Sequence, residues 1–154
     1  MNLFIVCTGK LKNSEYAAAV AEYTRRLPPG VRLKWVEVKA EKLGKISEAE
    51  AKRNEGKRIL AALPAGAEVI ALDETGEMLD SKGFARRLGD LRNRGRDLAF
   101  IIGGPLGLSP EVKTHAHRLL AFSRLTFQHD LVRVLLAEQI YRAFSILFGQ
   151  PYHK

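Results

Sequence analysis

Short apolar runs alternate with longer segments of helical periodicity, and this alternation leaves few folds open to the chain. The runs lie at residues 2–7, 31–38, 68–73, 97–102 and 119–123. Apolar runs of about four to eight residues between turn signals are typical of buried strands. Strands that alternate with helices build a mostly parallel sheet covered by helices. We therefore predict an α/β fold, in which residues 31–38 form an edge strand because their apolar and charged residues alternate.

Capping residues show where the intervening helices begin. Asn13 or Ser14 can accept the first backbone N–H groups of one helix, and Asp80 or Ser81 those of another. The other signals are a capping-box pair at Ser47 and Glu50 and the cap-proline-acid sequence Ser109-Pro110-Glu111. We expect helices over residues 14–27, 47–63, 81–94 and 130–148, and a further helix that begins at the last of these signals.

The size and charge of the chain suggest one domain with a polyanionic partner. Its 154 residues fit a single domain, residues 1–154, with one core. The net charge is +8, and surplus lysine and arginine attract polyanions at long range. The charge favours a nucleic acid as partner, against the alternative of a merely solvated basic surface. The stretch from Lys82 to Arg96 is the best candidate for phosphate contacts, and the basic residues 52–58 are interpreted as a solvated helix face.

The cellular compartment is inferred from what the sequence lacks. No apolar run reaches the roughly 20 residues that a membrane-spanning helix needs. The apolar start of the chain is too short for a signal peptide. Cys7 is the single cysteine, so no internal disulfide can form and a reducing cytoplasm is expected. The Cys7 thiol lies in an apolar run and is interpreted as a buried structural group.

The expected C-terminal helix is apolar around almost its whole circumference between Leu131 and Phe148. Such a helix must be covered on nearly all sides, which a small domain can hardly achieve for a terminal helix. A homodimer interface is therefore predicted, against the alternative of a central core helix. Glu138 and Arg142 are four residues apart and form either a helix salt bridge or a polar site at that interface.

The segment FIIGGPLGLS, residues 100–109, indicates a ligand site after a buried strand. Gly103 and Gly104 lack side chains, so the backbone there can approach a ligand closely. The segment is neither a G-x-G-x-x-G dinucleotide fingerprint nor a phosphate-binding loop, and a plain tight turn is the alternative. Ligands of parallel α/β sheets lie beyond the carboxyl ends of the strands. Residues 72–74, 103–108 and 123–128 leave strands at that edge.

Metal-dependent and covalent chemistry have little support in the sequence. His115 and His117 would point about 200° apart on a helix, so they do not converge on an ion. The chain has no G-x-S-x-G nucleophile elbow. We predict no metal.

Taken together, several segments resemble the ribosomal large-subunit methyltransferase H family, a group of small SPOUT-class enzymes. They are LDETGEMLDSKGFA, FIIGGPLGLSPEV, LTFQHDLVRVLLAEQIYRAFSILFG and the terminal PYHK, and they span nearly the whole chain. The resemblance implies a SPOUT-like α/β fold with a C-terminal trefoil knot. It also implies that S-adenosylmethionine is the methyl donor and that N3 of a pseudouridine in 23S rRNA, within the assembled ribosome, is the acceptor.

The resemblance implies a set of site residues as well. The cofactor is expected to be held largely through backbone groups of Leu72, Gly103 and the run Phe122, Ser123, Arg124, Leu125, Thr126 and Phe127. Removal of the N3 proton suits a base of near-neutral pKa, so His129 and His153 are candidates, with a structural role equally open for His129. Arg142, beside Glu138, is expected to stabilise the imide anion, and Tyr152 to stack on the target base.

The chain departs from the family pattern before its last helix. Where the family is expected to read close to L-P-H-P-L-V-R, residues 127–133 read FQHDLVR. The prolines that would stiffen this loop are absent, and we expect Asp130 to cap the helix instead. Leu106 stands where an acidic or polar residue would be common in relatives.

Three other functions stay open. The chain could methylate another RNA such as a tRNA, with the same cofactor site. It could be a non-catalytic module that binds the ribosome but not the cofactor. A nicotinamide-dependent oxidoreductase is a third alternative, disfavoured by the missing glycine fingerprint.

Overall fold

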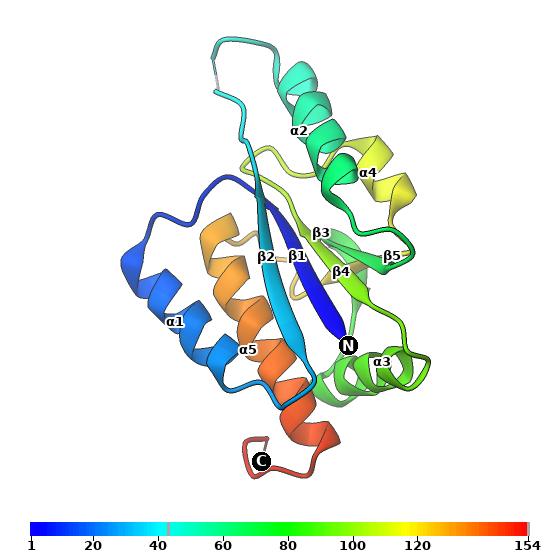
Figure 1. The fold of residues 1–154 in the computed structure, drawn as a ribbon. Helices are drawn as coiled ribbons and strands as arrows, with labels where there is room; N and C mark the ends of the chain where they lie inside the picture. Colours follow the sequence, from blue (N-terminus) through cyan, green and yellow to red (C-terminus); the bar gives the residue numbers. More distant parts are fainter. Residues whose placement is uncertain (43, 154) are drawn as a thin grey trace.

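Five parallel strands form one sheet in the computed structural model, which describes residues 1–42 and 44–153 (Figure 1). The elements are β1 (Asn2–Thr8), α1 (Ser14–Arg25), β2 (Arg32–Val38), α2 (Glu48–Ala62), β3 (Glu68–Met78), α3 (Ser81–Asn93), β4 (Leu98–Ile102), α4 (Pro110–His115), β5 (Arg118–Ala121) and α5 (His129–Leu147). The strand order β2-β1-β4-β3-β5 confirms the predicted parallel α/β sheet and places β2 at an edge. The trefoil knot stays a prediction.

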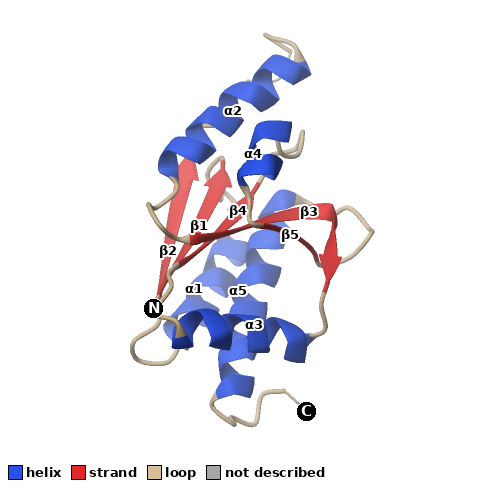
Figure 2. Cartoon of the chain, turned by 90° about the vertical axis from the view of Figure 1, so that its right-hand side faces the viewer, coloured by secondary structure: helices blue, strands red, loops and turns tan. Residues whose placement is uncertain are grey.

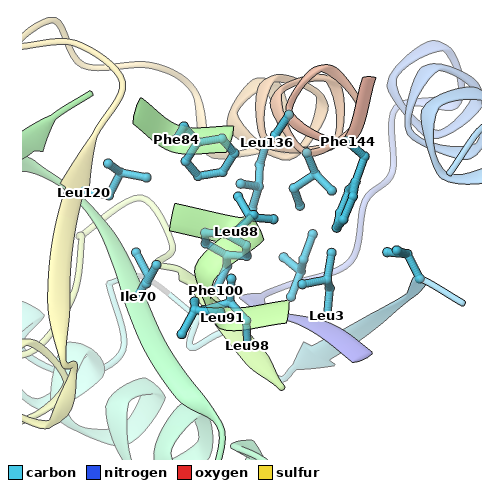
Figure 3. Close-up of a cluster of buried hydrophobic side chains, with 14 of the residues drawn as sticks. Leu3, Ile70, Phe84, Leu88, Leu91, Leu98, Phe100, Leu120, Leu136 and Phe144 are labelled. Atoms are coloured by element: carbon cyan, nitrogen blue, oxygen red, sulfur yellow. The ribbon is translucent and has the colours of Figure 1, made fainter. Parts of the chain in front are cut away.

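Helices cover both faces of the sheet, with α1, α3 and α5 on one face and α2 and α4 on the other (Figure 2). Alternate residues of the central strand β4 serve two cores: Phe100 packs with the first group of helices and Ile101 with the second. Figure 3 shows Phe84 and Leu88 of α3 and Phe144 of α5 in the first core. A strand buried on both faces reads as a continuous apolar run, which is why β4 was predictable.

The predicted caps of four helices are confirmed. The side chains of Asn13, Ser47, Asp80 and Ser109 accept hydrogen bonds from backbone N–H groups in the first turn of the helix that follows each. The expectation for α5 is wrong. Its N-cap position is Gln128, which makes no side-chain cap hydrogen bond, and Asp130 lies inside the first turn. One Asp130 carboxylate oxygen lies 3.3 Å from His129 Nε2 and 3.6 Å from Arg133 Nε, so it faces side chains rather than the helix end.

Strand β3 is longer than its apolar run predicts. The turn-rich exit expected after residue 73 is an irregularity, after which the strand continues to Met78 and pairs again with β5. The register shift lies between Leu72 and Glu77. Strand β5 ends at Ala121, two residues before the expected end at residue 123. This irregular part of β3 lies beside the chain that leaves β5.

Helix α5 packs against both α1 and α3 and contributes to the main core. Leu136, Ile140 and Phe144 are almost fully buried, so the domain covers much of α5 by itself. The expectation that a small domain could hardly do this is wrong for that part of the helix. A stripe of partly exposed residues remains on the other side: Leu131, Leu135, Glu138 and Arg142. The homodimer therefore stays a prediction, now restricted to this stripe and the exposed Leu147 and Phe148.

Within the described residues, none of the helices has the length and apolar character that crossing a membrane requires.

Candidate functional site

The exits of β3, β4 and β5 surround a cleft of about 850 Å³ at the carboxyl edge of the sheet. This is where ligands of parallel α/β sheets lie. Of the residues expected to hold a cofactor, the cleft is lined by Leu72, Gly103, Phe122, Ser123, Leu125, Thr126 and Phe127. Segments that are about fifty residues apart in the sequence thus meet at one cleft, and their role in holding a cofactor stays a prediction. Arg124 is absent from this lining within the described part of the chain.

The glycine segment forms one wall of the cleft as a tight backbone turn. Gly104 and Gly107 form an isolated β-bridge, and the Gly107 N–H donates to the Gly104 carbonyl at 2.9 Å. Gly107 has a φ of 77°, a backbone conformation that residues other than glycine rarely adopt. A Cβ on Gly103 would lie 3.0 Å from both the Gly107 carbonyl carbon and Leu108 Cδ2. The turn is therefore closely packed on itself, and Gly103–Leu108 line the cleft.

The loop after β5 also lines the cleft and is tied to the irregular part of β3. Arg124 Nη1 donates to the carbonyl oxygens of Glu74 and Gly76, the latter at 2.8 Å. Thr126 Oγ1 donates to a Glu74 carboxylate oxygen at 3.0 Å. The Arg124 side chain thus has a structural role here, and its predicted backbone contact with a cofactor stays a prediction.

Two of the charged residues that line the cleft, Asp73 and Lys113, form an ion pair. Lys113 Nζ lies 2.6 Å from Asp73 Oδ2, and the Thr75 backbone N–H donates to Asp73 Oδ1 at 3.0 Å. Burial works to raise the pKa of Asp73, but the hydrogen bonds from Lys113 and Thr75 outweigh it and hold the pKa below its ordinary value. Lys52 and His129 also line the cleft. No group of acidic, histidine or cysteine side chains able to hold a metal occurs among the residues that the structure describes.

Four of the five residues proposed for catalysis form a second cluster, at the C-terminal end of α5. Arg142 Nε donates to Glu138 Oε1 at 2.9 Å, and Tyr152 Oη donates to the same oxygen at 3.1 Å. Arg142 Nη1 lies 3.5 Å from His153 Nδ1, and its guanidinium lies 4.8 Å from the Tyr152 ring centroid. The hydrogen bond to Glu138 raises the pKa of Arg142, so the group stays cationic. The predicted helix pair and the predicted tail residues are thus one polar unit; Lys154, the last residue of the tail, lies outside the described residues.

His129, the fifth candidate, lies apart from this cluster. It begins α5 and lines the cleft, whereas Arg142 is thirteen residues further along the same helix. At about 1.5 Å per residue, the two positions are about 20 Å apart. Within one chain, His129 and His153 therefore cannot act on the same atom of a substrate.

The aromatic and basic surroundings of Tyr152 escaped the sequence analysis. Arg26 Nη2, just beyond α1, donates to Tyr141 Oη at 2.8 Å, and its guanidinium lies 5.6 Å from the Tyr152 ring centroid. The rings of Tyr141 and Tyr152 meet edge to face at 4.7 Å. Burial, then hydrogen bonds with Tyr23 and Glu138, raise the pKa of Tyr152, so its hydroxyl keeps its proton. The tail is thus fixed by α1 as well as by α5.

Arg133 is a buried cation that the sequence analysis also missed. Its side chain is 1% exposed, and its Nη2 donates to the carbonyl oxygens of Thr8 and Gly9 at 3.0 and 2.7 Å. Its Nη1 donates to Glu37 Oε1 at 3.0 Å. Arg133 therefore joins the start of α5 to the carboxyl ends of β1 and β2. The available signal was a single arginine on the buried stripe of an apolar helix.

His117 has a structural role, although the expectation that it continues a helix with His115 is wrong. Helix α4 ends at His115, and the His117 Nδ1 accepts a hydrogen bond from the Val69 N–H at 3.0 Å. The His117 N–H donates in turn to the Val69 carbonyl at 2.9 Å. The residue thus continues the pairing of β3 and β5 and offers no support for a metal site.

The sequence of this chain matches a known protein family, and its fold matches solved structures. Residues 1–153 match the family model described as predicted SPOUT methyltransferase. A ribosomal RNA large subunit methyltransferase H of Clostridium novyi is 45% identical over 159 residues, covering 100% of both chains, and one of Burkholderia lata is 44% identical, covering 100% of this chain and 99% of its own. A solved structure described as a probable methyltransferase, from Bordetella pertussis, superposes with a TM-score of 0.53 at 17% identity, covering 92% of this chain and 95% of its own. That last likeness concerns the fold alone.

Proposed function

Because this chain belongs to the SPOUT methyltransferase family, we propose that it transfers the methyl group of S-adenosylmethionine to N3 of a pseudouridine in 23S rRNA. The observation that carries the proposal is the cleft, because it gathers nearly all the positions at which the resemblance expects a cofactor. The names of the full-length relatives support ribosomal RNA of the large subunit as the substrate.

The cleft suits S-adenosylmethionine in size and chemistry. Small-molecule sites commonly measure about 300–1,000 Å³, and this one lies within that range. Its walls at Gly103–Leu108 and Phe122–Phe127 are loops, whose backbone N–H and C=O groups can pair with the edge of an adenine. When bound, S-adenosylmethionine supplies an electrophilic methyl group. The residues of the chain then need to orient the acceptor base and remove its N3 proton.

The acceptor chemistry fits the cluster at the end of α5. The imidazole of His153 or His129 would take the proton from N3. The freed electron pair on N3 would then bond to the methyl carbon as the bond from that carbon to the sulfonium sulfur breaks, and S-adenosylhomocysteine would leave. Arg142 stays cationic and stabilises the negative charge that develops on the imide. Tyr152 is held against Tyr141 beside Arg142, where its ring can receive the target base.

Cleft and cluster are about 20 Å apart in one chain, so we propose that each active site is shared by two subunits. The stripe formed by Leu131, Leu135, Glu138 and Arg142 runs along α5 between the two sites. A twofold axis across this stripe pairs the helices in opposite directions. That pairing brings the tail of one copy to the cleft of the other.

Methyl transfer from labelled S-adenosylmethionine tests the activity, with ribosomes and tRNA offered separately. We expect label in 23S rRNA only. Label in tRNA would show another RNA to be the substrate, and failure to bind S-adenosylmethionine in calorimetry would favour a non-catalytic ribosome-binding module. An oxidoreductase would bind a nicotinamide cofactor instead.

Variants defective either in cofactor binding or in turnover test the shared site. Gly103→Val should abolish cofactor binding, whereas Arg142→Ala or removal of residues 151–154 should retain it and depress turnover. A mixture of Gly103→Val and Arg142→Ala chains, unfolded and refolded together, should regain about a quarter of wild-type activity, because a mixed dimer has one intact site. No recovery would show that each site lies within one chain.

A further inference from the structure

A second hollow, of about 330 Å³, lies between α3 and the β3–β5 edge of the sheet. Figure 1 shows α3 below that edge. The charged residues that line this hollow are Arg86, Arg87, Arg94 and Arg118, with Glu68 and Asp90. We call this hollow the arginine groove. Cations that gather around a concave surface raise its positive potential, and an anion in the groove relieves their mutual repulsion.

Glu77 holds two of these arginines in place. Its carboxylate forms an ion pair with Arg87 of α3, and its Oε1 lies 3.8 Å from Arg118 Nη1 at the start of β5. The hydrogen bond from Arg87 lowers the pKa of Glu77, so the carboxylate keeps its charge. A single acid thus positions guanidinium groups from two different elements on one side of the groove.

The other two arginines are exposed and available. Arg86 of α3 and Arg94, the residue directly after α3, are both exposed. Among the described residues, neither takes part in an ion pair or donates a side-chain hydrogen bond. A planar guanidinium with free N–H groups binds phosphate oxygens in pairs, more specifically than a lysine ammonium does.

The groove lies close to the cleft along β5. Arg118 begins this strand and lines the groove, and Ala121 ends it and lines the cleft. Three residues at about 3.3 Å each separate them by about 10 Å. A nucleic-acid strand whose target base meets the cofactor at the cleft can therefore lay neighbouring phosphates along the groove.

We propose that the arginine groove binds the phosphodiester backbone of the RNA whose base enters the cleft. The proposal rests on the proposed function for the identity of that RNA. Phosphate contacts fix the position of a nucleic acid without reading its sequence, so the groove serves affinity and placement rather than chemistry.

The test compares two double variants that remove equal charge from opposite faces of the sheet. Arg86→Ala/Arg94→Ala alters the groove, and Arg53→Ala/Lys57→Ala alters exposed residues of α2. Binding of ribosomes with unmodified 23S rRNA is measured directly at several salt concentrations, along with methyl transfer. The groove variant should bind about tenfold more weakly, and the slope of log affinity against log salt should be shallower by about two. Its affinity for S-adenosylmethionine and its turnover at saturating ribosomes should match the wild type.

Three further outcomes are decisive. The α2 variant should bind ribosomes within about twofold of wild type, and equal losses in the two variants would overturn the proposal. Arg86→Lys/Arg94→Lys should recover the wild-type salt slope, because the charges remain, but only part of the affinity, because the paired N–H contacts are lost. Weakened binding to ribosomes with unchanged binding to protein-free 23S rRNA would indicate a ribosomal protein in the groove and would also overturn it. Because binding is measured without catalysis, a wild-type protein that binds but does not methylate would refute the proposed function and leave this comparison intact.

Discussion

Gly76 lies where the irregular part of β3 meets the backbone of β5, and its replacement measures how closely the two fit. A Cβ at Gly76 would lie 2.5 Å from Leu119 C and Leu120 N and 2.7 Å from the Leu119 carbonyl oxygen. Ordinary van der Waals contact begins at 3.4 Å, so Gly76→Ala must separate the two backbones by about 1 Å. Overpacking commonly costs about 1–3 kcal/mol. We expect about 3 kcal/mol, because backbone atoms on both sides cannot rotate away as a side chain can.

Urea unfolding supplies the measurement, and Gly89→Ala is the matched control. A Cβ at Gly89 would lie 2.9 Å from Leu147 Cδ2, the end of a flexible side chain that is 37% exposed. Alanine also favours the interior of α3 by up to about 1 kcal/mol over glycine. Gly89→Ala should therefore leave stability unchanged or raise it. If Gly76→Ala unfolds at the same urea concentration as Gly89→Ala, the close contact between β3 and β5 is refuted.

Three further perturbations follow from buried or restrained groups. Arg133→Leu should lower the free energy of unfolding by about 3–5 kcal/mol, because it leaves Glu37 and two backbone carbonyls without their donor. Urea titration measures this, and a loss below about 1 kcal/mol would contradict it. Burial raises the pKa of Cys7 from 9.0 to about 11, so the unfolded state loses its proton first. The stability that this group contributes is full below pH 9 and is lost as the pH rises to 11, and Cys7→Ala should show a flatter pH dependence there. Arg26→Ala removes a hydrogen bond to Tyr141 and should speed carboxypeptidase digestion of the tail and lower turnover, with unchanged cofactor affinity; an unchanged digestion rate would argue against its positioning role.

The layout of strands and helices was predictable because burial and capping leave local patterns. Strand β4 is apolar at every position since both its faces are covered. Asn13, Ser47, Asp80 and Ser109 satisfy N–H groups of the turn that follows them, so the start of each helix is visible in a few residues. The positions expected to surround a cofactor came from the resemblance, and the parallel sheet explains why three distant strand exits meet.

The features that escaped prediction depend on contacts distant in sequence. Polar turn signals at residues 73–76 hid the continuation of β3, which only its pairing with β5 supports. The buried Arg133 donates to the carbonyl oxygens of Thr8 and Gly9 at the end of β1. The sequence around Arg133 contains no sign of these distant partners. The tail folds back onto α5 after Gly149, whose φ is 65°. That reversal unites Tyr152 and His153 with Arg142 and leaves His129 about 20 Å away, as the length of the helix requires.

Mass mapping of 23S rRNA tests the central claim most directly. The rRNA is compared between cells that have this protein, cells that lack it, and the latter cells supplied with wild-type or Arg142→Ala protein. We predict that one pseudouridine loses a single methyl group in the absence of the protein. The wild-type protein should restore that methyl group, whereas Arg142→Ala should restore it poorly. Identical methylation of 23S rRNA with and without the protein would contradict the proposed function.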